Sequence, residues 1–188
     1  MKKYFVLTFV LAFAGCFMAR AQKVGLSLNA AEAAYLGSID IEAQYALAQN
    51  WSVSAGGTYN PWSWGKGTEV ERNRRRRDFS LGARWWPWHV YSGWWVSGGA
   101  MWQEYNEANI LFSKDNTSEE GDRLGLRLGA GYTYMVNSWL NIDFGIRGFG
   151  GNTRYVTYEC PTCGKVLDRG DKFFIMPDEA VLSLMFVF

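Results

Sequence analysis

Ala180-Val181-Leu182-Ser183-Leu184-Met185-Phe186-Val187-Phe188 is the stretch of sequence that decides the fold. Side chains along a β-strand point alternately to opposite faces, so Ala180, Leu182, Leu184, Phe186 and Phe188 share one face. A last strand of this kind is expected where its apolar face meets lipid and its last ring lies at the membrane interface. A buried final strand of a soluble sheet is the alternative that this stretch alone leaves open.

Seven earlier segments show the same period-two alternation of apolar and polar or small residues. Ile39 to Leu47 is the clearest of them, because Asp40, Glu42 and Gln44 alternate there with apolar residues. With the last strand they make eight, an even number, as in outer-membrane barrels. The seven segments cover residues 24–30, 39–47, 51–59, 79–85, 94–102, 124–134 and 140–146.

The connections between these segments alternate between short and long. Short turns are expected at 48–50, 87–93 and 136–138, and long polar stretches at 60–78, 103–121 and 150–178. Short periplasmic turns and long extracellular loops are the architecture of outer-membrane barrels. The sequence therefore predicts an all-β fold, namely an eight-stranded antiparallel transmembrane β-barrel in the outer membrane.

The first 21 residues have the plan of a secretory signal peptide. Lys2 and Lys3 precede an apolar run, and Ala19-Arg20-Ala21 offers the small residues of a cleavage site. The run is too short for a transmembrane helix, which needs roughly 20 apolar residues. Small residues before Cys16 offer a competing lipoprotein-type site, so cleavage after Ala21 and lipidation of Cys16 both stay open. We predict a signal peptide over residues 1–21 and one barrel domain over residues 22–188.

Composition agrees with a barrel and excludes several other classes of protein. Aromatic residues make up 17% of the chain, and 21 glycines stand against 4 prolines, which is unlike a disordered linker. The formal net charge of +1 gives no reason to expect a nucleic-acid partner. Tryptophans flank the short turns, where indole rings suit a membrane interface. We predict a periplasmic aromatic belt of Trp51, Trp85, Trp86, Trp88, Trp94, Trp95 and Trp139.

The faces opposite the apolar ones carry charged residues that would lie in the lumen. An eight-stranded barrel has an interior just wide enough for side chains to fill. Buried charges must be paired, so we expect a packed network of ion pairs rather than an open pore. A catalytic or binding site that uses the same carboxylates is the alternative. The predicted network contains Asp40, Glu42, Arg84, Arg127, Asp143 and Arg147.

Two clusters in the long connections could carry chemistry. Cys160 and Cys163 form a single knuckle, and the one histidine, His89, lies in a predicted turn at the opposite end, so no complete metal site is expected within the chain. A local disulfide is the default in an oxidising compartment, with an intermolecular metal knuckle or redox exchange as alternatives.

A basic loop suits anionic lipopolysaccharide or a phosphorylated or acidic partner, because arginine binds phosphate bidentately. This loop contains Arg72, Arg74, Arg75, Arg76 and Arg77.

Two motifs resemble a family of small outer-membrane proteins from Bacteroides-type bacteria, catalogued as a domain of unknown function (DUF3575). One is Gly56-Gly57-Thr58-Tyr59-Asn60-Pro61-Trp62, and the other is Arg84-Trp85-Trp86, where the family has tyrosine at position 85. The resemblance implies an eight-stranded barrel, and some members accompany fimbrial genes. It transfers no catalytic residue. The last strand also resembles the closing strand of outer-membrane barrels, in which Phe186 and Phe188 would be read by the barrel-insertion machinery.

These observations favour a non-enzymatic outer-membrane protein with a structural or surface-interaction role. Its extracellular loops would bind a surface component, such as lipopolysaccharide or a fimbrial or other surface protein. The sequence has no nucleophile elbow, phosphate-binding loop or zinc-protease motif, and we expect no cofactor and no metal. The alternatives are an outer-membrane enzyme acting on lipid or peptide at the rim, and a soluble periplasmic barrel that binds an apolar ligand.

Overall fold

The computed structural model describes residues 23–34, 37–64, 72–108, 117–160 and 164–188. The predicted signal peptide and Cys16 lie outside the described residues. No helix in the described part of the chain is long and apolar enough to cross a membrane. A short helix, α2 (Ala30–Ala34), follows the first strand. The strands are β1 (Val24–Asn29), β2 (Ile39–Ala48), β3 (Trp51–Asn60), β4 (Ser63–Trp64), β5 (Arg72–Trp85), β6 (Gly93–Ala108), β7 (Ser118–Met135), β8 (Leu140–Tyr158) and β9 (Val166–Val187).

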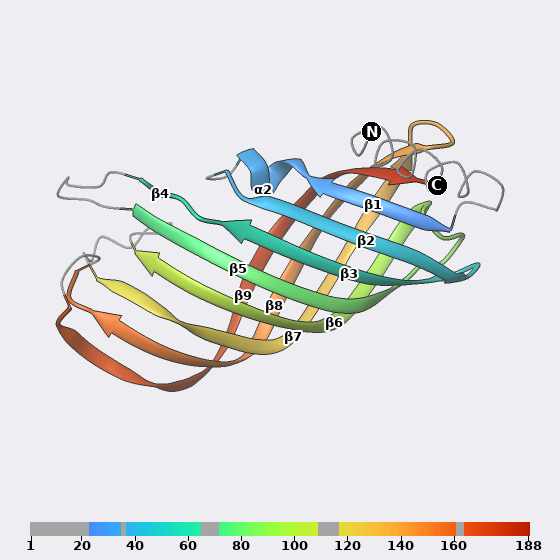
Figure 1. Cartoon of the computed structure of the whole chain (residues 1–188). Coiled ribbons are helices and arrows are strands. Elements are labelled where there is room, and N and C mark those ends of the chain that lie inside the picture. The colour runs from blue at the N-terminus through green and yellow to red at the C-terminus, as the bar shows by residue number, and fades with distance from the viewer. Residues whose placement is uncertain (1–22, 35–36, 65–71, 109–116, 161–163) are drawn as a thin grey trace, which may run out of the picture.

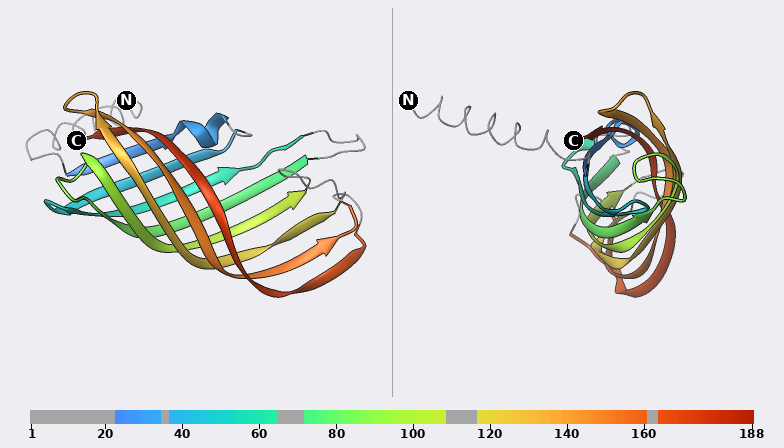
Figure 2. Two further views of the ribbon diagram at one scale, coloured as in Figure 1. Left: turned by 180° about the vertical axis from the view of Figure 1, so that it is seen from behind. Right: turned by 90° about the vertical axis from the view of Figure 1, so that its right-hand side faces the viewer.

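The strands form one antiparallel sheet that closes on itself. The sheet order is β3-β2-β1-β9-β8-β7-β6-β5-β4, and β3 also pairs with β5 from Trp51↔Trp85 to Asn60↔Arg76. The first and last strands, β1 and β9, pair from Gly25↔Val187 to Asn29↔Ser183. Eight strands thus make a ring, and β4 is a two-residue addition beside β5 (Figures 1 and 2). The predicted all-β fold of eight antiparallel strands is confirmed.

The distribution of side chains is the reverse of that in a soluble protein. Large apolar side chains lie on the outside of the ring, and Leu126, Leu128 and Ile146 are 65%, 65% and 73% exposed. Arg84 and Asp143 lie inside, and each is 1% exposed. Soluble proteins almost never bury charged residues fully while exposing many leucines in one zone. The alternation in the sequence therefore places apolar residues outside and charged residues inside.

Several strands are longer than the sequence indicated. The stretches 60–78, 103–121 and 150–178 were predicted as loops, but β5 begins at Arg72, β6 extends to Ala108, β7 begins at Ser118, β8 extends to Tyr158 and β9 begins at Val166. Both faces of these extensions carry polar residues, so the apolar alternation disappears although the backbone ladder continues. The short helix α2 lies in the connection between the first two predicted strands.

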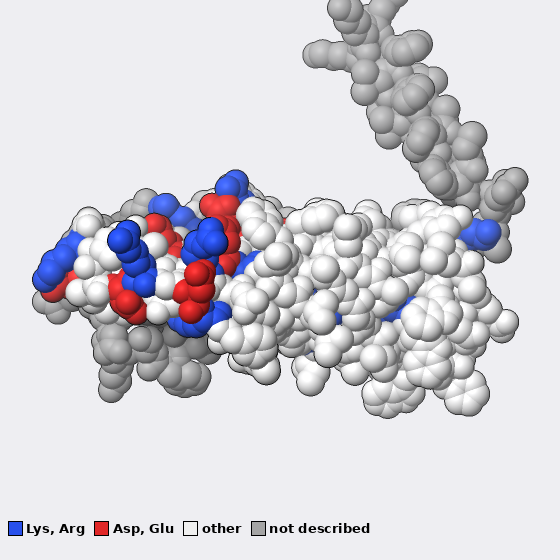
Figure 3. Space-filling view, turned by 90° about the horizontal axis from the view of Figure 1, so that it is seen from below, with Lys and Arg blue, Asp and Glu red and all other residues white. Residues whose placement is uncertain are grey.

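An outward-facing row of charged residues marks the place where the apolar zone ends. Across five neighbouring strands, the register pairs Arg77 with Glu104, Glu104 with Asp122, Asp122 with Arg154, and Arg154 with Asp171. We call these five residues the charged row. Figure 3 shows charged side chains gathered at one end of the molecule, whereas the remaining surface in that view is almost free of them. The outer surface is thus divided into an apolar zone and a charged end.

Glycines in β7 and β8 make room for a tryptophan inside the ring. Trp95 is 1% exposed, and a Cβ added to Gly131 or Gly145 would lie only 2.4 or 2.8 Å from its Cζ2 atom. Real Cβ atoms do not approach other atoms so closely, so any side chain at these positions would displace the ring. Gly148, on the outward face of the same strand as Gly145, has no atom closer than 3.6 Å to such a Cβ.

We predict that Gly145→Val lowers the free energy of unfolding by about 1–3 kcal/mol, because overpacking forces side chains and backbone to shift. Gly148→Val is the matched control on the same strand, and it should change stability little. Urea unfolding of the protein in detergent micelles, followed by tryptophan fluorescence, measures both. Equal stability of the two variants would contradict the packing described for Trp95.

Candidate functional site: the charged interior

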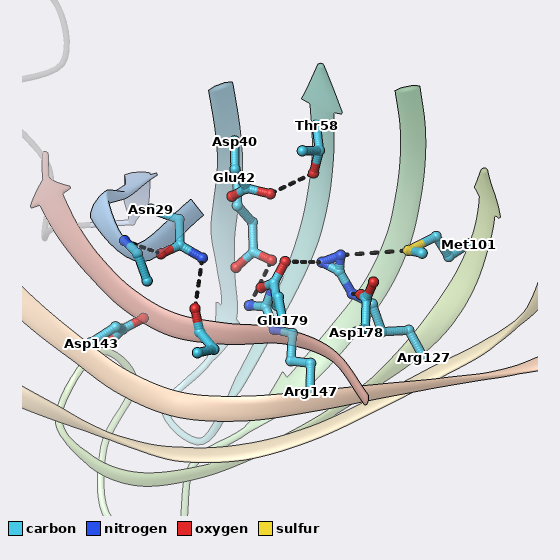
Figure 4. A network of polar contacts seen from close by, with 12 residues as sticks. Asn29, Asp40, Glu42, Thr58, Met101, Arg127, Asp143, Arg147, Asp178 and Glu179 are labelled. Carbon is cyan, nitrogen blue, oxygen red and sulfur yellow. Dashed lines mark hydrogen bonds and ion pairs between the residues drawn. The ribbon is translucent and has the colours of Figure 1, made fainter. Parts of the chain in front are cut away.

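Ion pairs between distant strands fill the middle of the ring. Arg84 of β5 donates to Glu42 of β2 and to Asp143 of β8, each at 2.7 Å. Arg147 of β8 contacts the other oxygen of Glu42 at 2.8 Å and donates to Glu179 of β9, also at 2.8 Å. All five side chains are at most 9% exposed. They are the core of what we call the central network, completed by Arg127 and Asp178. Figure 4 labels its members apart from Arg84.

A β-bulge in β9 brings two adjacent carboxylates into this network. The register with β8 shifts between Arg147↔Glu179 and Gly148↔Pro177, so Asp178 is an extra residue in β9. Asp178 and Glu179 are both buried, although neighbours in a regular strand point to opposite faces. Proline lacks a backbone N–H and is tolerated in sheets at bulges, which fits Pro177.

Arg127 of β7 lies between these two carboxylates. Its Nε is 3.6 Å from Asp178 Oδ2, and its Nη2 is 3.7 Å from Glu179 Oε2. These distances are too long for hydrogen bonds, and neither oxygen has a hydrogen-bond partner within the described residues. Arg127 also directs Nη1 to Met101 Sδ at 3.6 Å. The guanidinium therefore balances the charge of two acids without binding either of them directly.

Asp40 is held in a different way from the other lumen residues. It accepts a hydrogen bond from Thr58 Oγ1 at 2.7 Å, and no described Arg or Lys approaches it within 4.0 Å. On the same strand, Glu42 accepts a further hydrogen bond from Gln44 at 2.8 Å. Of the six residues predicted for the lumen, the structure brings Glu42, Arg84, Asp143 and Arg147 into direct ion-pair contact. Asp40 and Arg127 lie beside them.

Two tryptophans assigned to the periplasmic belt point into the ring instead. Trp86 and Trp95 are 0% and 1% exposed, and the Arg84 guanidinium carbon lies 5.4 and 4.1 Å from their ring centroids. Trp86 also donates to Ser52 Oγ at 3.1 Å. The period of two explains the error, because Trp94 and Trp95 are neighbours and cannot share a face. The other belt tryptophans are exposed as expected: Trp51, Trp85, Trp88, Trp94 and Trp139.

The predicted basic loop is part of a strand. Residues Arg72 to Arg77 belong to β5, and the alternation splits them between the two faces. Arg76 points inward, donates to Asp78 at 2.7 Å and to Asp178 at 3.1 Å, and is 4% exposed. Arg74 is also buried, with Nη1 3.8 Å from Glu32 of α2. Only Arg75 and Arg77 of this run face outward with described side chains, so a five-arginine surface does not exist.

Beyond the central network, the interior continues as a hydrogen-bonded lining. Arg123 contacts Gln103 at 2.9 Å and Glu107 at 3.1 Å, and its guanidinium lies 3.4 Å from the centroid of the Tyr105 ring. Burial raises the pKa of Tyr105, which lies past the apolar zone, to about 12. Its hydroxyl therefore stays protonated at neutral pH and donates to Glu119 at 2.7 Å. Sequence reasoning missed Arg123, Asp178 and Glu179. Asp178 is in a stretch predicted as a loop, and the other two lie between a predicted loop and the predicted strand that follows it.

The remaining candidates are the two cysteines and the histidine. Cys160 lies just past the end of β8, whereas Cys163 falls outside the described residues, so their pairing stays a prediction. His89 lies in the turn between β5 and β6, with Nδ1 3.0 Å from the Val90 carbonyl. No group of three or more potential ligands is gathered within the described residues.

The space at the middle of the central network is small. A cavity beside the central network measures about 20 Å³ and is lined by Glu42, Arg127, Arg147 and small residues of β3, β5 and β6. That volume is enough for about one water molecule. The carboxylates around it are engaged by arginines from other strands. Charge balance between carboxylates and arginines of different strands is what a structural plug requires.

We predict that Arg84→Met lowers the free energy of unfolding by about 3–5 kcal/mol, because it leaves Asp143 without its buried counter-charge. Lys165→Met is the control. It removes the positive charge from the exposed Lys165–Glu159 ion pair and should change stability little. Arg84→Met combined with Asp143→Asn should recover part of the loss. An Arg84→Met protein that unfolds at the same urea concentration as the wild type would show that the central network does not stabilise the ring.

Comparison with known proteins places the chain in a family. No curated protein matches the sequence. The family model described as a protein of unknown function, DUF3575, matches residues 7–188, which includes every strand of the ring. The match also includes the acidic pair of the bulge and the arginines of the central network. The chain therefore belongs to the DUF3575 family.

Proposed function

We propose that the ring spans the bacterial outer membrane as a non-enzymatic β-barrel, with the short turns in the periplasm and the long strands extending outside the cell. The observation that carries this proposal is the inverted distribution of side chains, with leucines outside and ion pairs inside. Apolar surface on this scale is unfavourable in water. A bilayer removes that cost, and a closed ring leaves no backbone edge within the hydrocarbon.

The borders of the apolar zone support the same placement. Trp94 and Trp102 lie at its two ends on β6, and both are exposed. The segment between them is close to the length of roughly 9–11 residues that a tilted transmembrane strand needs. Aromatic side chains flank the zone at both ends, and the charged row follows at the end with the long strands. Aromatic girdles around an apolar band are typical of outer-membrane barrels.

The end with the long strands offers a surface for interaction. A hollow of about 700 Å³ is lined there by Tyr59, Arg75, Arg77, Glu104, Asp122 and Arg154, among others. Arginine pairs bidentately with phosphate, so phosphorylated lipopolysaccharide would fit beside Arg75 and Arg77. Another surface protein, such as a fimbrial subunit, is the second class of partner that the proposal includes. Phe188, which is 52% exposed, would present the terminal signal to the insertion machinery.

Membrane insertion is tested by placing a charge in the apolar zone. We predict that Leu128→Arg makes folding into lipid vesicles less favourable by about 2–4 kcal/mol, the cost of arginine on the lipid face near mid-membrane. Asp122→Arg, on the same face of β7 but in the charged row, should fold nearly as well as wild type. Heat-modifiable mobility in electrophoresis reports the folded fraction. If both variants fold alike in vesicles, the apolar zone is not a lipid-facing surface.

The surface role is tested by crosslinking in cells. A photocrosslinking residue at Glu159, beyond the end of β8, should capture a protein or a phosphorylated glycolipid, because the proposal places it outside the cell. The same residue at Asn137, in the turn at the opposite end, is the control and should capture neither. Identical adducts from the two positions would contradict the proposed orientation.

A further inference from the structure

The outer half of β9 has one edge that no described strand covers. Along the other edge, β9 pairs with β8 as far as Tyr158↔Val166. The short strand β1 pairs with β9 only as far as Asn29↔Ser183. Beyond this pair, the Asn29 side chain donates to Ala180 O and accepts from Leu182 N–H, both at 3.2 Å. Figures 1 and 2 show this half of β9 as the margin of the extended sheet.

An open strand edge presents backbone groups that can pair with another chain. One of these backbone groups, the Arg169 N–H, donates to the Asp168 side chain instead of to a neighbouring strand, with an N–Oδ1 distance of 2.8 Å. Apolar side chains also remain uncovered at the beginning of the strand, where Val166 and Leu167 are 49% and 51% exposed. These two residues lie beyond the charged row, outside the proposed membrane. The edge is therefore exposed in water and partly apolar, as a docking site requires.

The sequence along this edge is its own antiparallel complement. Residues 166–174 read Val-Leu-Asp-Arg-Gly-Asp-Lys-Phe-Phe, with Gly170 at the centre. If an identical strand ran antiparallel about Gly170, each acid would face a base, because Asp168 would oppose Lys172 and Arg169 would oppose Asp171. Leu167 and Val166 would oppose the two phenylalanines. Opposite charges and apolar pairs directly across an antiparallel ladder are the pairs that stabilise it.

Two charged side chains of the edge, Asp168 and Lys172, are already bonded to neighbouring strands. Asp168 accepts a hydrogen bond from Tyr155 at 2.9 Å, and Lys172 donates to Glu119 at 2.8 Å. Asp171 lies 3.4 Å from Arg154 with its side chain 75% exposed, so it can accept a second cation from outside. Side chains that are fixed before binding lose less entropy when a partner arrives.

A second copy in the same membrane cannot supply the partner strand. Two identical strands that continue one sheet in antiparallel fashion are related by a two-fold axis perpendicular to that sheet. This axis reverses every direction within the sheet, including the length of the ring. The second barrel would therefore point the opposite way, with its apolar zone outside the membrane.

We propose that Val166–Phe174 is a docking edge for an extended segment of another exported polypeptide, which adds an antiparallel strand to β9. The segment carries basic residues opposite Asp168 and Asp171 and acidic residues opposite Arg169 and Lys172, with apolar residues at its ends. This inference rests on the proposed surface function, because that function places the edge outside the cell.

The test uses the complement that the chain itself provides. The full-length protein, folded in lipid nanodiscs, is titrated into a fluorescent peptide with the sequence of residues 166–174, and binding is followed by anisotropy. The control peptide has the four charges reversed, with Lys, Asp, Arg and Asp at the positions of Asp168, Arg169, Asp171 and Lys172. We expect the control to bind at least tenfold more weakly. A protein with Asp168→Lys, Arg169→Asp, Asp171→Arg and Lys172→Asp should show the reverse preference.

Three results would overturn the inference: no binding of the first peptide, equal binding of the two peptides, or a peptide-independent species of twice the mass that is lost when only Asp168→Lys and Asp171→Lys are introduced, because all four charges of the edge are then basic and repel in a second copy. The last would assign the edge to a second copy. Heat-modifiable mobility of the same samples reports folding in lipid independently. A folded, inserted protein that binds no peptide would refute the docking edge and leave the proposed membrane function intact.

Discussion

Charge neutralisation inside a closed ring is the constraint on which the rest of the structure depends. With leucines and aromatic residues outside, the charged residues of each strand must lie inside, where an unpaired charge is very costly. The partners come from different strands: Glu42 from β2, Arg84 from β5, Arg147 from β8 and Glu179 from β9. These pairs form only if the ring closes in this register. A slip of one residue in any of the four strands would turn its charge outward and leave its partner alone.

The bulge at Asp178 connects this interior to the shape of the outer end. An extra residue in β9 allows two consecutive acids to face Arg127 and the neighbouring arginines. A bulge also bends its strand and increases the local twist. At the same point along β9, strand β1 ends and the Asn29 side chain takes its place. One local irregularity therefore supplies charges to the interior and coincides with the point where β9 loses its second neighbour.

Much of the ring could be predicted from the sequence, because the division into an apolar face and a polar or charged face repeats from strand to strand. The alternation around Ile39 and Leu124 placed both strands and their inward charges in advance of the structure. It failed where the physical cause of the alternation is absent. Beyond the charged row both faces carry polar residues, so the pattern of apolar residues vanishes although the hydrogen-bonded ladder continues through Arg77 and Arg154. Asp178 was missed for a related reason, since a bulge breaks the period of two on which the prediction relied.

Arginine–carboxylate pairs are fixed where they are buried in this protein and exchangeable where they are exposed. Between Arg84 and Asp143 no water competes, so the pair is held in one geometry and its loss leaves an uncompensated charge. Between Arg154 and Asp171 water screens the attraction, and either side chain can exchange its partner at little cost. Stable pairing inside is compatible with an unchanging scaffold, whereas exchangeable pairing at the outer end is compatible with binding. The same chemistry can therefore hold the ring closed and leave its long-strand end free to accept a partner, because only the second set of charges remains in contact with water.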